Sequence, residues 1–236
     1  MTESRYYVSD SQRAEKVRQL FSTIARRYDL MNDVMSFGLH RFWKRRVADW
    51  SGLVKGQRAL DVCCGTGDIA ATLAGKGAAA VGLDFAAPML AIAQKRYGTT
   101  VDWIRGDALH LPFPDGNFDA VTLGFGLRNL ADFEAGLRES LRVTRPGGRV
   151  LVLDFGIPEN KVWRAIYFLW LRLAVPLLGW FFAGDRDAYR YILASLENYP
   201  AQSGVRELMQ KIGCENPRVI NFLGGVSSIH IGERVR

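Results

Sequence analysis

Three aspartates lie at the ends of successive apolar segments, and their spacing is the clearest sign of chemistry in the chain. Asp61, Asp84 and Asp107 each close or directly follow a short run typical of a buried strand. The carboxyl ends of parallel strands meet at one edge of a sheet, where ligands bind; there Asp84 can accept both ribose hydroxyls of an adenosine. Asp107 with the backbone of Ala108 can hold an adenine edge, and Asp61 can balance an ammonium group. Lone acids at such positions are usually helix caps, but three in register favour one shared nucleoside.

The segment ALDVCCGTGD, Ala59–Asp68, is the loop expected beside such a ligand. Gly65 and Gly67 remove side chains where the backbone must approach a ligand closely. The loop lacks the G-x-G-x-x-G of dinucleotide sites and the GK[ST] of a phosphate-binding loop, which argues against a pyrophosphate cradle. A glycine-rich turn by itself is equally typical of a tight strand-to-helix connection, so the ligand assignment depends on the three aspartates.

Alternating strand and helix patterns must position these residues. The expected strands are Arg58–Cys63, Ala78–Leu83, Val101–Arg105, Phe118–Gly124, Arg149–Phe155, Arg218–Leu223 and Val226–Gly232. The expected helices cover residues 11–50 with an interruption at 36–38, then 68–74, 88–97, 132–143, 160–183 and 185–213. This alternation predicts an α/β, Rossmann-like fold with a mostly parallel seven-stranded sheet. Gly224-Gly225 suits a tight turn, so we expect the last two strands to form an antiparallel hairpin.

The length of 236 residues suits one α/β domain. We expect this single domain to have four parts: an N-terminal helical cap at 11–50, a cofactor-binding core at 58–155, a helical lid over the substrate site at 160–213, and a C-terminal hairpin at 218–232.

Charge and cysteine content limit the partners and the compartment. The net charge of +7 and the pI near 9.5 favour an acidic partner, such as nucleic acid or an anionic membrane surface. Part of the excess lies between Arg26 and Arg46, where a solvated helix face is the simpler interpretation. The three cysteines have neither a disulfide pattern nor metal-ligand spacing, so we expect no metal and a reduced, cytoplasmic compartment. The first ten residues are polar, and we expect no secretory signal.

The segment VWRAIYFLWLRLAVPLLGWFFA, Val162–Ala183, is long enough to cross a bilayer. It contains Arg164, Arg172 and Pro176, and a charge near the centre of a membrane span costs roughly 2.5–3.5 kcal/mol. Two interpretations remain: a buried helical pair broken at Pro176, or an apolar lid that contacts a membrane or a lipophilic ligand.

The loop and the strand-end acids together resemble the class I S-adenosylmethionine (SAM)-dependent methyltransferases. The matching segments are D-V-C-C-G-T-G from Asp61, L-D-F from Leu83, G-D-A from Gly106 and R-P-G-G-R-V-L-V-L-D from Arg145. Cys63 replaces the first glycine of the usual loop pattern, a change that small residues tolerate. The resemblance implies SAM as the cofactor. The expected cofactor-binding residues are Asp61, Gly65, Thr66, Gly67, Asp84, Asp107 and Ala108.

The segment YDLMNDVMSFGLHRFWKRR, Tyr28–Arg46, resembles a narrower family, the quinone C-methyltransferases of menaquinone and ubiquinone biosynthesis. The family pairs Y-D-x-M-N with S-x-G-x-H-x-x-W, and the matches are Tyr28, Asp29, Met31, Asn32, Ser36, Gly38, His40 and Trp43. A second family pattern matches residues 142–156, except that Asp154 and Gly156 replace a common Glu and Ser. Gly124 replaces a serine that contacts the cofactor in this family. With F-G-L-R-N at 125–129 and the tail L-G-G-V-S-S-I-H-I-G, the resemblance covers nearly the whole chain beyond Ser11.

This resemblance implies methyl transfer from SAM to a ring carbon of a polyprenylated demethylquinol. Demethylmenaquinol is favoured over the benzoquinol of the ubiquinone pathway. The basic charge fits transient docking to an anionic membrane, whereas no nucleic acid is expected, because aromatic and basic residues are not interleaved as in a binding module. A homodimer is left open. The alternatives are methylation of another small lipid or of RNA, and a non-catalytic SAM- or quinone-binding subunit.

Four side chains are candidates for the chemistry. A quinol ring becomes nucleophilic once a hydroxyl loses its proton, so a proton acceptor is needed. Arg128 is expected to stabilise the phenolate or to order a water, and Asn129 to hydrogen-bond the other oxygen. Asp154 is either the proton acceptor or a cap of the following turn. His40 has a suitable intrinsic pKa, although a lone histidine in a helix is more often structural.

Overall fold

The computed structural model describes residues 12–183 and 186–235, and a single sheet of seven strands forms its centre. The strands are β1 (Arg58–Val62), β2 (Ala79–Asp84), β3 (Asp102–Arg105), β4 (Phe118–Gly124), β5 (Thr144–Phe155), β6 (Cys214–Phe222) and β7 (Ser227–Arg234). Their order is β3-β2-β1-β4-β5-β7-β6. β1 to β5 are parallel, and β7 is antiparallel to both β5 and β6. The predicted fold class is confirmed, including the C-terminal hairpin.

Helices cover both faces of the sheet because alternate residues of the strands are apolar on each side. The helices that pack on the faces are α3 (Leu39–Trp50), α4 (Asp68–Gly75), α5 (Ala87–Tyr97), α6 (Phe133–Val143) and α10 (Ala201–Lys211). Leu60, Val121 and Val152 pack with α6 and α10 on one face. Ala59, Ala120 and Leu151 pack with α3 and α4 on the other. The strand order reverses at β1, between β2 and β4, and ligands of open α/β sheets bind at that point.

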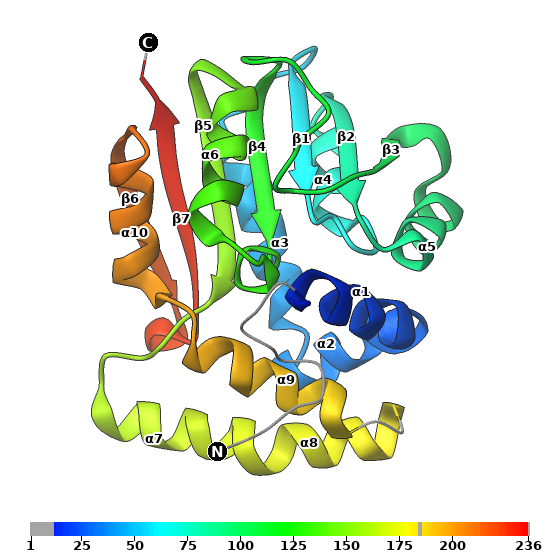
Figure 1. The fold of residues 1–236 in the computed structure, drawn as a ribbon, viewed down its shortest axis with the longest axis vertical. Coiled ribbons are helices and arrows are strands. Elements are labelled where there is room, and N and C mark those ends of the chain that lie inside the picture. The colour runs from blue at the N-terminus through cyan, green and yellow to red at the C-terminus, as the bar shows by residue number, and fades with distance from the viewer. Residues whose placement is uncertain (1–11, 184–185, 236) are drawn as a thin grey trace.

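The N-terminal helices cross beneath the carboxyl ends of the parallel strands (Figure 1). They are α1 (Arg13–Ile24), a 3₁₀ turn at Ala25–Arg27, and α2 (Tyr28–Ser36), which precedes α3. Phe37 and Gly38 separate α2 from α3 with φ angles of 51° and 75°. This left-handed backbone ends one helix and starts the next, so the predicted interruption is confirmed.

The segment 160–213, expected as the lid, starts with one continuous helix and a second helix, α9 (Arg186–Glu197), and these two form the lid; α10 (Ala201–Lys211) packs on the sheet instead. The continuous helix comprises α7 (Lys161–Leu169), a π turn at Trp170–Ala174, α8 (Val175–Leu178) and a second π turn at Gly179–Ala183. Of the two interpretations of this segment, the helical pair broken at Pro176 is wrong, because the helix continues through the proline. A proline lacks the N–H and crowds the preceding turn. Here the π turn just before it, in which the Val175 N–H bonds to the Trp170 carbonyl, re-routes the backbone bonds and lets the helix continue.

Two connections differ from the sequence expectation. The segment Arg145–Gly148, between the expected helix 132–143 and the expected strand Arg149–Phe155, belongs to β5, whose register with β4 shifts between Phe118 and Ala120. The hairpin between β6 and β7 closes through a short 3₁₀ turn at Leu223–Gly225 rather than a two-residue turn. Both glycines of this turn have positive φ angles, 64° and 102°, as their placement there predicted.

Candidate active site

A cavity of about 160 Å³ lies at the carboxyl ends of β1, β2 and β4. We call it the cofactor cavity. Its lining includes Val17 and Phe21 of α1, Gly65 of the glycine loop, Asp84, Phe85, Asp107, Ala108, Gly126 and Asn129. It therefore lies where the strand order predicts a ligand, and two of the three strand-end aspartates contribute to it.

Asp84 is the best-placed acceptor in the cofactor cavity. Its two carboxylate oxygens accept hydrogen bonds from the Gly65 N–H at 2.8 Å and the Ala86 N–H at 2.9 Å. Burial raises the pKa of Asp84, and these backbone donors act in the opposite direction. The amides hold the carboxylate in one orientation, so two ribose hydroxyls can donate to it without a rearrangement of the protein.

Asp107 and Ala108 form the adjacent wall. The Leu109 N–H donates to the Asp107 carboxylate at 2.9 Å, and Ala108 is buried. Asp107 remains exposed, so a ligand can reach its second oxygen. Their positions fit the adenine contact expected for them, which stays a prediction.

Asp61 and Thr66 lie behind the loop rather than on the cavity, as neither is among the residues that line it. The Asp61 carboxylate accepts from the Thr122 hydroxyl at 2.7 Å and from the Ala70 N–H at 3.1 Å, and burial raises its pKa to about 7. Thr66 donates its hydroxyl to Asp29 at 2.8 Å. These contacts position the loop; direct contacts with a cofactor stay predictions for both residues.

Packing explains several glycines of the site. A Cβ on Gly67 would lie 2.5 Å from the Trp103 ring, whereas a Cβ on Gly65 would meet nothing. The missing side chain of Gly65 therefore leaves space for a ligand, and that of Gly67 leaves space for the Trp103 ring. At Gly124, where the family has a serine, an added Cβ would lie 2.2 Å from the Ile69 side chain.

Cys63, at the position of the usual first glycine, has a φ of 56°. The left-handed region costs a non-glycine residue about 1–2 kcal/mol, which explains why glycine is usual here. Gly126 supplies the space for the thiol, because a Cβ at that position would lie 2.6 Å from the Cβ of Cys63.

A second cavity of about 290 Å³, which we call the acceptor cavity, adjoins the first. The two share Phe21, Tyr28 and Phe125 in their linings. The other lining residues are largely apolar and come from α1, α2, α3 and the lid, including Leu20, Met35, Trp163, Ile166, Trp170, Leu171 and Val175. Of the aromatic residues of the continuous lid helix, Trp163, Tyr167 and Trp170 line this cavity and Phe168 packs on the core, but Trp180 and Phe181 are exposed. The side chain of Phe182 lies outside the described residues.

Arg128 and Asp154 form a buried ion pair at the wall of the acceptor cavity. The guanidinium donates to the carboxylate, and the Arg128 backbone N–H adds a bond of 3.1 Å. Burial acts to lower the pKa of Arg128, but the neighbouring charge of Asp154 outweighs it and the pKa is raised. Arg128 lines the acceptor cavity, whereas Asp154 is fully buried behind it. Asp154 is thus placed to hold Arg128 rather than to meet a substrate.

Both polar atoms of the Asn129 side-chain amide are hydrogen-bonded to the protein. Its Nδ2 donates to the Phe125 carbonyl at 2.8 Å, and its Oδ1 accepts from the Tyr191 hydroxyl at 3.1 Å. It lines the cofactor cavity, not the acceptor cavity. The contact with a substrate oxygen expected for Asn129 stays a prediction, and its position favours the cofactor side.

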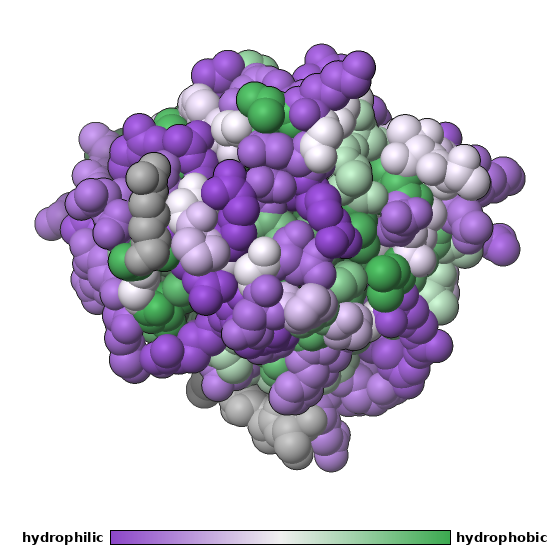
Figure 2. All heavy atoms as spheres, turned by 90° about the horizontal axis from the view of Figure 1, so that it is seen from above, coloured by the Kyte–Doolittle hydropathy of each residue, from purple (hydrophilic) through white to green (hydrophobic). Residues whose placement is uncertain are grey.

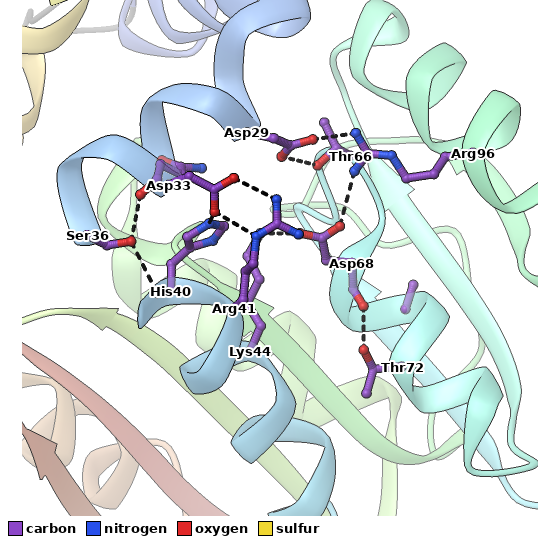
Figure 3. Close-up of polar contacts among 12 residues, drawn as sticks. Asp29, Asp33, Ser36, His40, Arg41, Lys44, Thr66, Asp68, Thr72 and Arg96 are labelled. Atoms are coloured by element: carbon purple, nitrogen blue, oxygen red, sulfur yellow. Dashed lines mark hydrogen bonds and ion pairs between the residues drawn. The ribbon is translucent and has the colours of Figure 1, made fainter. Parts of the chain in front are cut away.

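His40 lines the acceptor cavity and is 2% exposed. Its Nε2 lies 2.9 Å from Asp33 Oδ1, and Arg41 binds the same carboxylate (Figure 3). The guanidinium of Arg41 holds the pKa of Asp33 well below its usual range. Because the ionised Asp33 can only accept, the ring hydrogen lies on Nε2 and Nδ1 has a free lone pair. Within the described residues, Nδ1 is buried without a hydrogen-bond partner.

Ion pairs hold α2 and α3 against the glycine loop (Figure 3). Asp29 of α2 accepts from Thr66 and from Arg96, at 2.8 and 2.6 Å. Lys44 of α3, itself buried, binds Asp68 at 2.7 Å. The helices that carry Tyr28 and His40 are therefore fixed relative to the loop beside the cofactor cavity.

Sequence reasoning missed Asp33 and Tyr167. Asp33 lies seven residues before His40, a spacing that brings the two together only because Phe37 and Gly38 turn the chain. The Tyr167 hydroxyl is buried in the acceptor cavity, and no described residue bonds to it. One signal was available: Tyr167 is a hydroxyl-bearing residue in an otherwise apolar stretch.

Among the described residues, no group of three His, Cys, Asp or Glu side chains could hold a metal ion.

The fold and the cofactor cavity define a class of protein, the class I SAM-dependent methyltransferases. A SAM-dependent methyltransferase from Thermotoga maritima has this fold, with a TM-score of 0.66 at 19% identity, covering 92% of this chain and 99% of that one. Phosphoethanolamine N-methyltransferase 2 of Haemonchus contortus, solved with S-adenosylhomocysteine, gives a TM-score of 0.62 at 16% identity, over 82% and 52% of the two chains. At these identities the likeness is one of fold.

Sequence comparison places the chain more narrowly. The ubiE/COQ5 methyltransferase family model matches residues 8–234, and the chain belongs to this family. It is 40% identical to the ubiquinone/menaquinone biosynthesis C-methyltransferase UbiE of Roseobacter denitrificans, over 95% of this chain and 93% of that one. It is 37% identical to the demethylmenaquinone methyltransferase of Staphylococcus aureus, over 92% of each chain.

Proposed function

We propose that this enzyme transfers a methyl group from SAM to a ring carbon of a polyprenylated demethylquinol, with demethylmenaquinol as the favoured acceptor. The observation that carries the proposal is the pair of adjoining cavities: one has fixed carboxylate acceptors, the other is apolar, and both are lined by Phe21, Tyr28 and Phe125. The benzoquinol of the ubiquinone pathway is the second candidate, because the Roseobacter relative is named for both pathways.

The residues of the cofactor cavity fit SAM. Asp84 offers a carboxylate fixed by two amides for the ribose, and the exposed oxygen of Asp107 lies beside the buried Ala108 for the adenine. Bound SAM supplies an electrophilic methyl group on a positively charged sulfur. The residues shared by the two cavities exclude water from the junction, because Phe21 and Phe125 are apolar and Tyr28 is half-buried.

The quinol must be activated as a nucleophile before it can accept the methyl group. The ring carbon gains nucleophilic character when the hydroxyl on the neighbouring carbon loses its proton. After the ring carbon has taken the methyl group, its hydrogen leaves as a proton and the ring oxygen regains one, so the aromatic quinol is restored and one proton is released per turnover. We assign His40 as the proton acceptor, since its Nδ1 carries a free lone pair and Asp33 stabilises the imidazolium that forms. Burial lowers the pKa of His40 and the charge of Lys44 lowers it further, so the ring is neutral at pH 7. The positive charge of Arg128, held by Asp154, stabilises the phenolate.

The quinol assignment is tested by the oxidation state of the acceptor. Methyl transfer to demethylmenaquinone is expected to require a reductant, and to fall at least about 100-fold when the acceptor is kept oxidised, because the quinone ring is electrophilic. The measurement is incorporation of labelled methyl from SAM, identified by mass spectrometry, with the naphthoquinol and the benzoquinol as parallel acceptors. Equal rates on quinone and quinol would rule out this chemistry. Label in RNA alone, or in no acceptor, would favour the alternative substrates or a non-catalytic role.

Replacing His40 by glutamine is expected to lower kcat about 100-fold, within the usual range for loss of a general base. The wild-type rate should fall as the pH drops through the lowered pKa of His40, below 6.5, because the protonated ring cannot accept a proton. The variant should lack this acid limb while its KM for SAM is unchanged. Ser36→Ala is the matched control, since Ser36 lines the same cavity. Its hydroxyl bonds to the Asn32 carbonyl and to the His40 backbone N–H, and not to the His40 ring. An unchanged pH profile in the His40 variant would remove His40 from the mechanism.

We also propose that the protein works in the cytoplasm and meets its prenylated substrate at an anionic membrane surface. The net charge of +7 supports this proposal. Size-exclusion chromatography with light scattering distinguishes a homodimer from a monomer.

A further inference from the structure

Seven large apolar side chains form a stripe along the outer side of the lid helix Lys161–Ala183. They are Val162, Ile166, Leu169, Leu173, Leu177, Trp180 and Phe181, each between 52% and 76% exposed. From Val162 to Trp180 they are spaced by three or four residues, which keeps them on one side of the helix, and Phe181 follows Trp180 directly. We call this set the outer stripe. The helix is long and apolar enough to cross a membrane by length and composition alone, and only 28% of its most apolar window is buried.

The opposite side of the same helix is already occupied by the protein. Tyr167, Leu171 and Val175 are buried there and line the acceptor cavity. A helix that is apolar on all sides normally has partners on all sides. Because the inner side is needed to close the cavity, the helix cannot leave the protein to cross a bilayer. The outer stripe can still lie against the surface of one, with the helix parallel to it.

The acceptor cavity opens beside this stripe. Five of its lining residues are also exposed, and all five are apolar: Phe37, Leu39, Trp163, Ile166 and Leu223. They come from the turn between α2 and α3, the first residue of α3, helix α7 and the β6–β7 turn. Trp163 Nε1 donates to the Leu223 carbonyl at 2.8 Å. Ile166 belongs both to this mouth and to the outer stripe.

The charges of the lid helix favour an anionic lipid surface as the partner of the outer stripe. The charged residues of Lys161–Phe181 are Lys161, Arg164 and Arg172, all basic and all exposed, with no acid between them. Basic residues flanking an apolar helix face are typical of helices that lie at an anionic membrane interface. The opposite end of the molecule, at the amino ends of the parallel strands, is largely hydrophilic (Figure 2).

We infer that the outer stripe docks the enzyme on an anionic bilayer, and that the quinol headgroup passes from the lipid into the acceptor cavity through the mouth at Phe37, Trp163 and Leu223. The prenyl tail then remains in the bilayer, and no apolar part of the substrate crosses water. This inference rests on the proposed function for the identity of the substrate, but the docking itself can be measured without any methyl transfer.

The test places charges on the stripe in the double variant Leu169→Glu/Leu173→Glu. Neither side chain lines the cavity and both are more than half exposed, so the fold and the site should be unchanged. The matched control is Val54→Glu, which adds a charge at an equally exposed apolar residue outside the lid. Binding is measured by co-sedimentation with vesicles of phosphatidylcholine containing phosphatidylglycerol. Turnover is measured on a long-chain demethylquinol in these vesicles and on a short-chain quinol in solution.

The double variant is expected to bind vesicles at least about tenfold more weakly and to lose long-chain turnover in proportion. Its turnover on the short-chain quinol and its melting temperature should match those of the wild type, and Val54→Glu should behave as the wild type throughout. Wild-type vesicle binding by the double variant would overturn the inference. So would loss of a dimer with vesicle binding retained, which would identify the stripe as a self-association surface. If the wild-type enzyme binds vesicles but methylates neither quinol, the proposed function fails and the docking surface stands.

Discussion

Replacing Arg128 by methionine is expected to lower the free energy of unfolding by about 3–5 kcal/mol and to abolish detectable methyl transfer. The loss of stability arises because Asp154 is fully buried, and removing its partner leaves an unpaired charge away from water. The loss of activity arises because the guanidinium lines the acceptor cavity, where the phenolate develops. Urea unfolding followed by circular dichroism measures the first effect, and labelled methyl transfer measures the second.

The double variant Arg128→Met/Asp154→Leu separates these two roles. Removing both charges of a buried pair is often neutral for stability, so the double variant should recover most of the unfolding free energy. It should still lack activity, because the positive charge at the cavity is gone. Recovery of turnover together with stability would show that Arg128 is only structural. A mild stability loss in the single variant would show that water reaches Asp154.

Replacing Asp84 by alanine is expected to weaken SAM binding about 100- to 10,000-fold. Two hydrogen bonds from ribose hydroxyls to a carboxylate contribute roughly 1.5–3 kcal/mol each, and about 1.4 kcal/mol corresponds to a tenfold change in Kd. The substitution also releases the Gly65 N–H, which bonds to this carboxylate. Isothermal titration calorimetry with SAM and with S-adenosylhomocysteine measures the effect.

Asp102→Ala is the matched control for Asp84, because it removes an exposed acid from β3 that does not line the cavity. It should leave the Kd for SAM within about twofold of the wild type, a change of less than 0.5 kcal/mol. At saturating SAM, the Asp84 variant should retain a large part of its kcat, since the carboxylate contacts the cofactor away from the reacting methyl group. A Kd for the Asp84 variant within threefold of the wild type would contradict the assigned ribose contact.

The fold class followed from local patterns in the sequence. β1 and β2 are buried on both sides along nearly their whole length, so each appears as a continuous apolar run, and the aspartates at the ends of these strands share one sheet edge. The boundary of β5 was harder to place. The residues Arg145–Gly148 have the composition of a turn, and the structure places them in an irregularity of β5 between the paired residues Thr144 and Arg149, with Gly147 at a φ of 73°.

The sequence by itself determined the family, the cofactor loop and the strand-end acids, because these depend on short patterns read along one segment. Only the tertiary structure decided which candidates share a cavity. It places Arg128 and His40 on the acceptor cavity, Asn129 on the cofactor cavity, and Asp61 and Asp154 behind the walls. It also pairs Arg128 with Asp154 across 26 residues of sequence. Such contacts depend on how β4, β5, the N-terminal helices and the lid pack together, and no local spacing of residues records that packing.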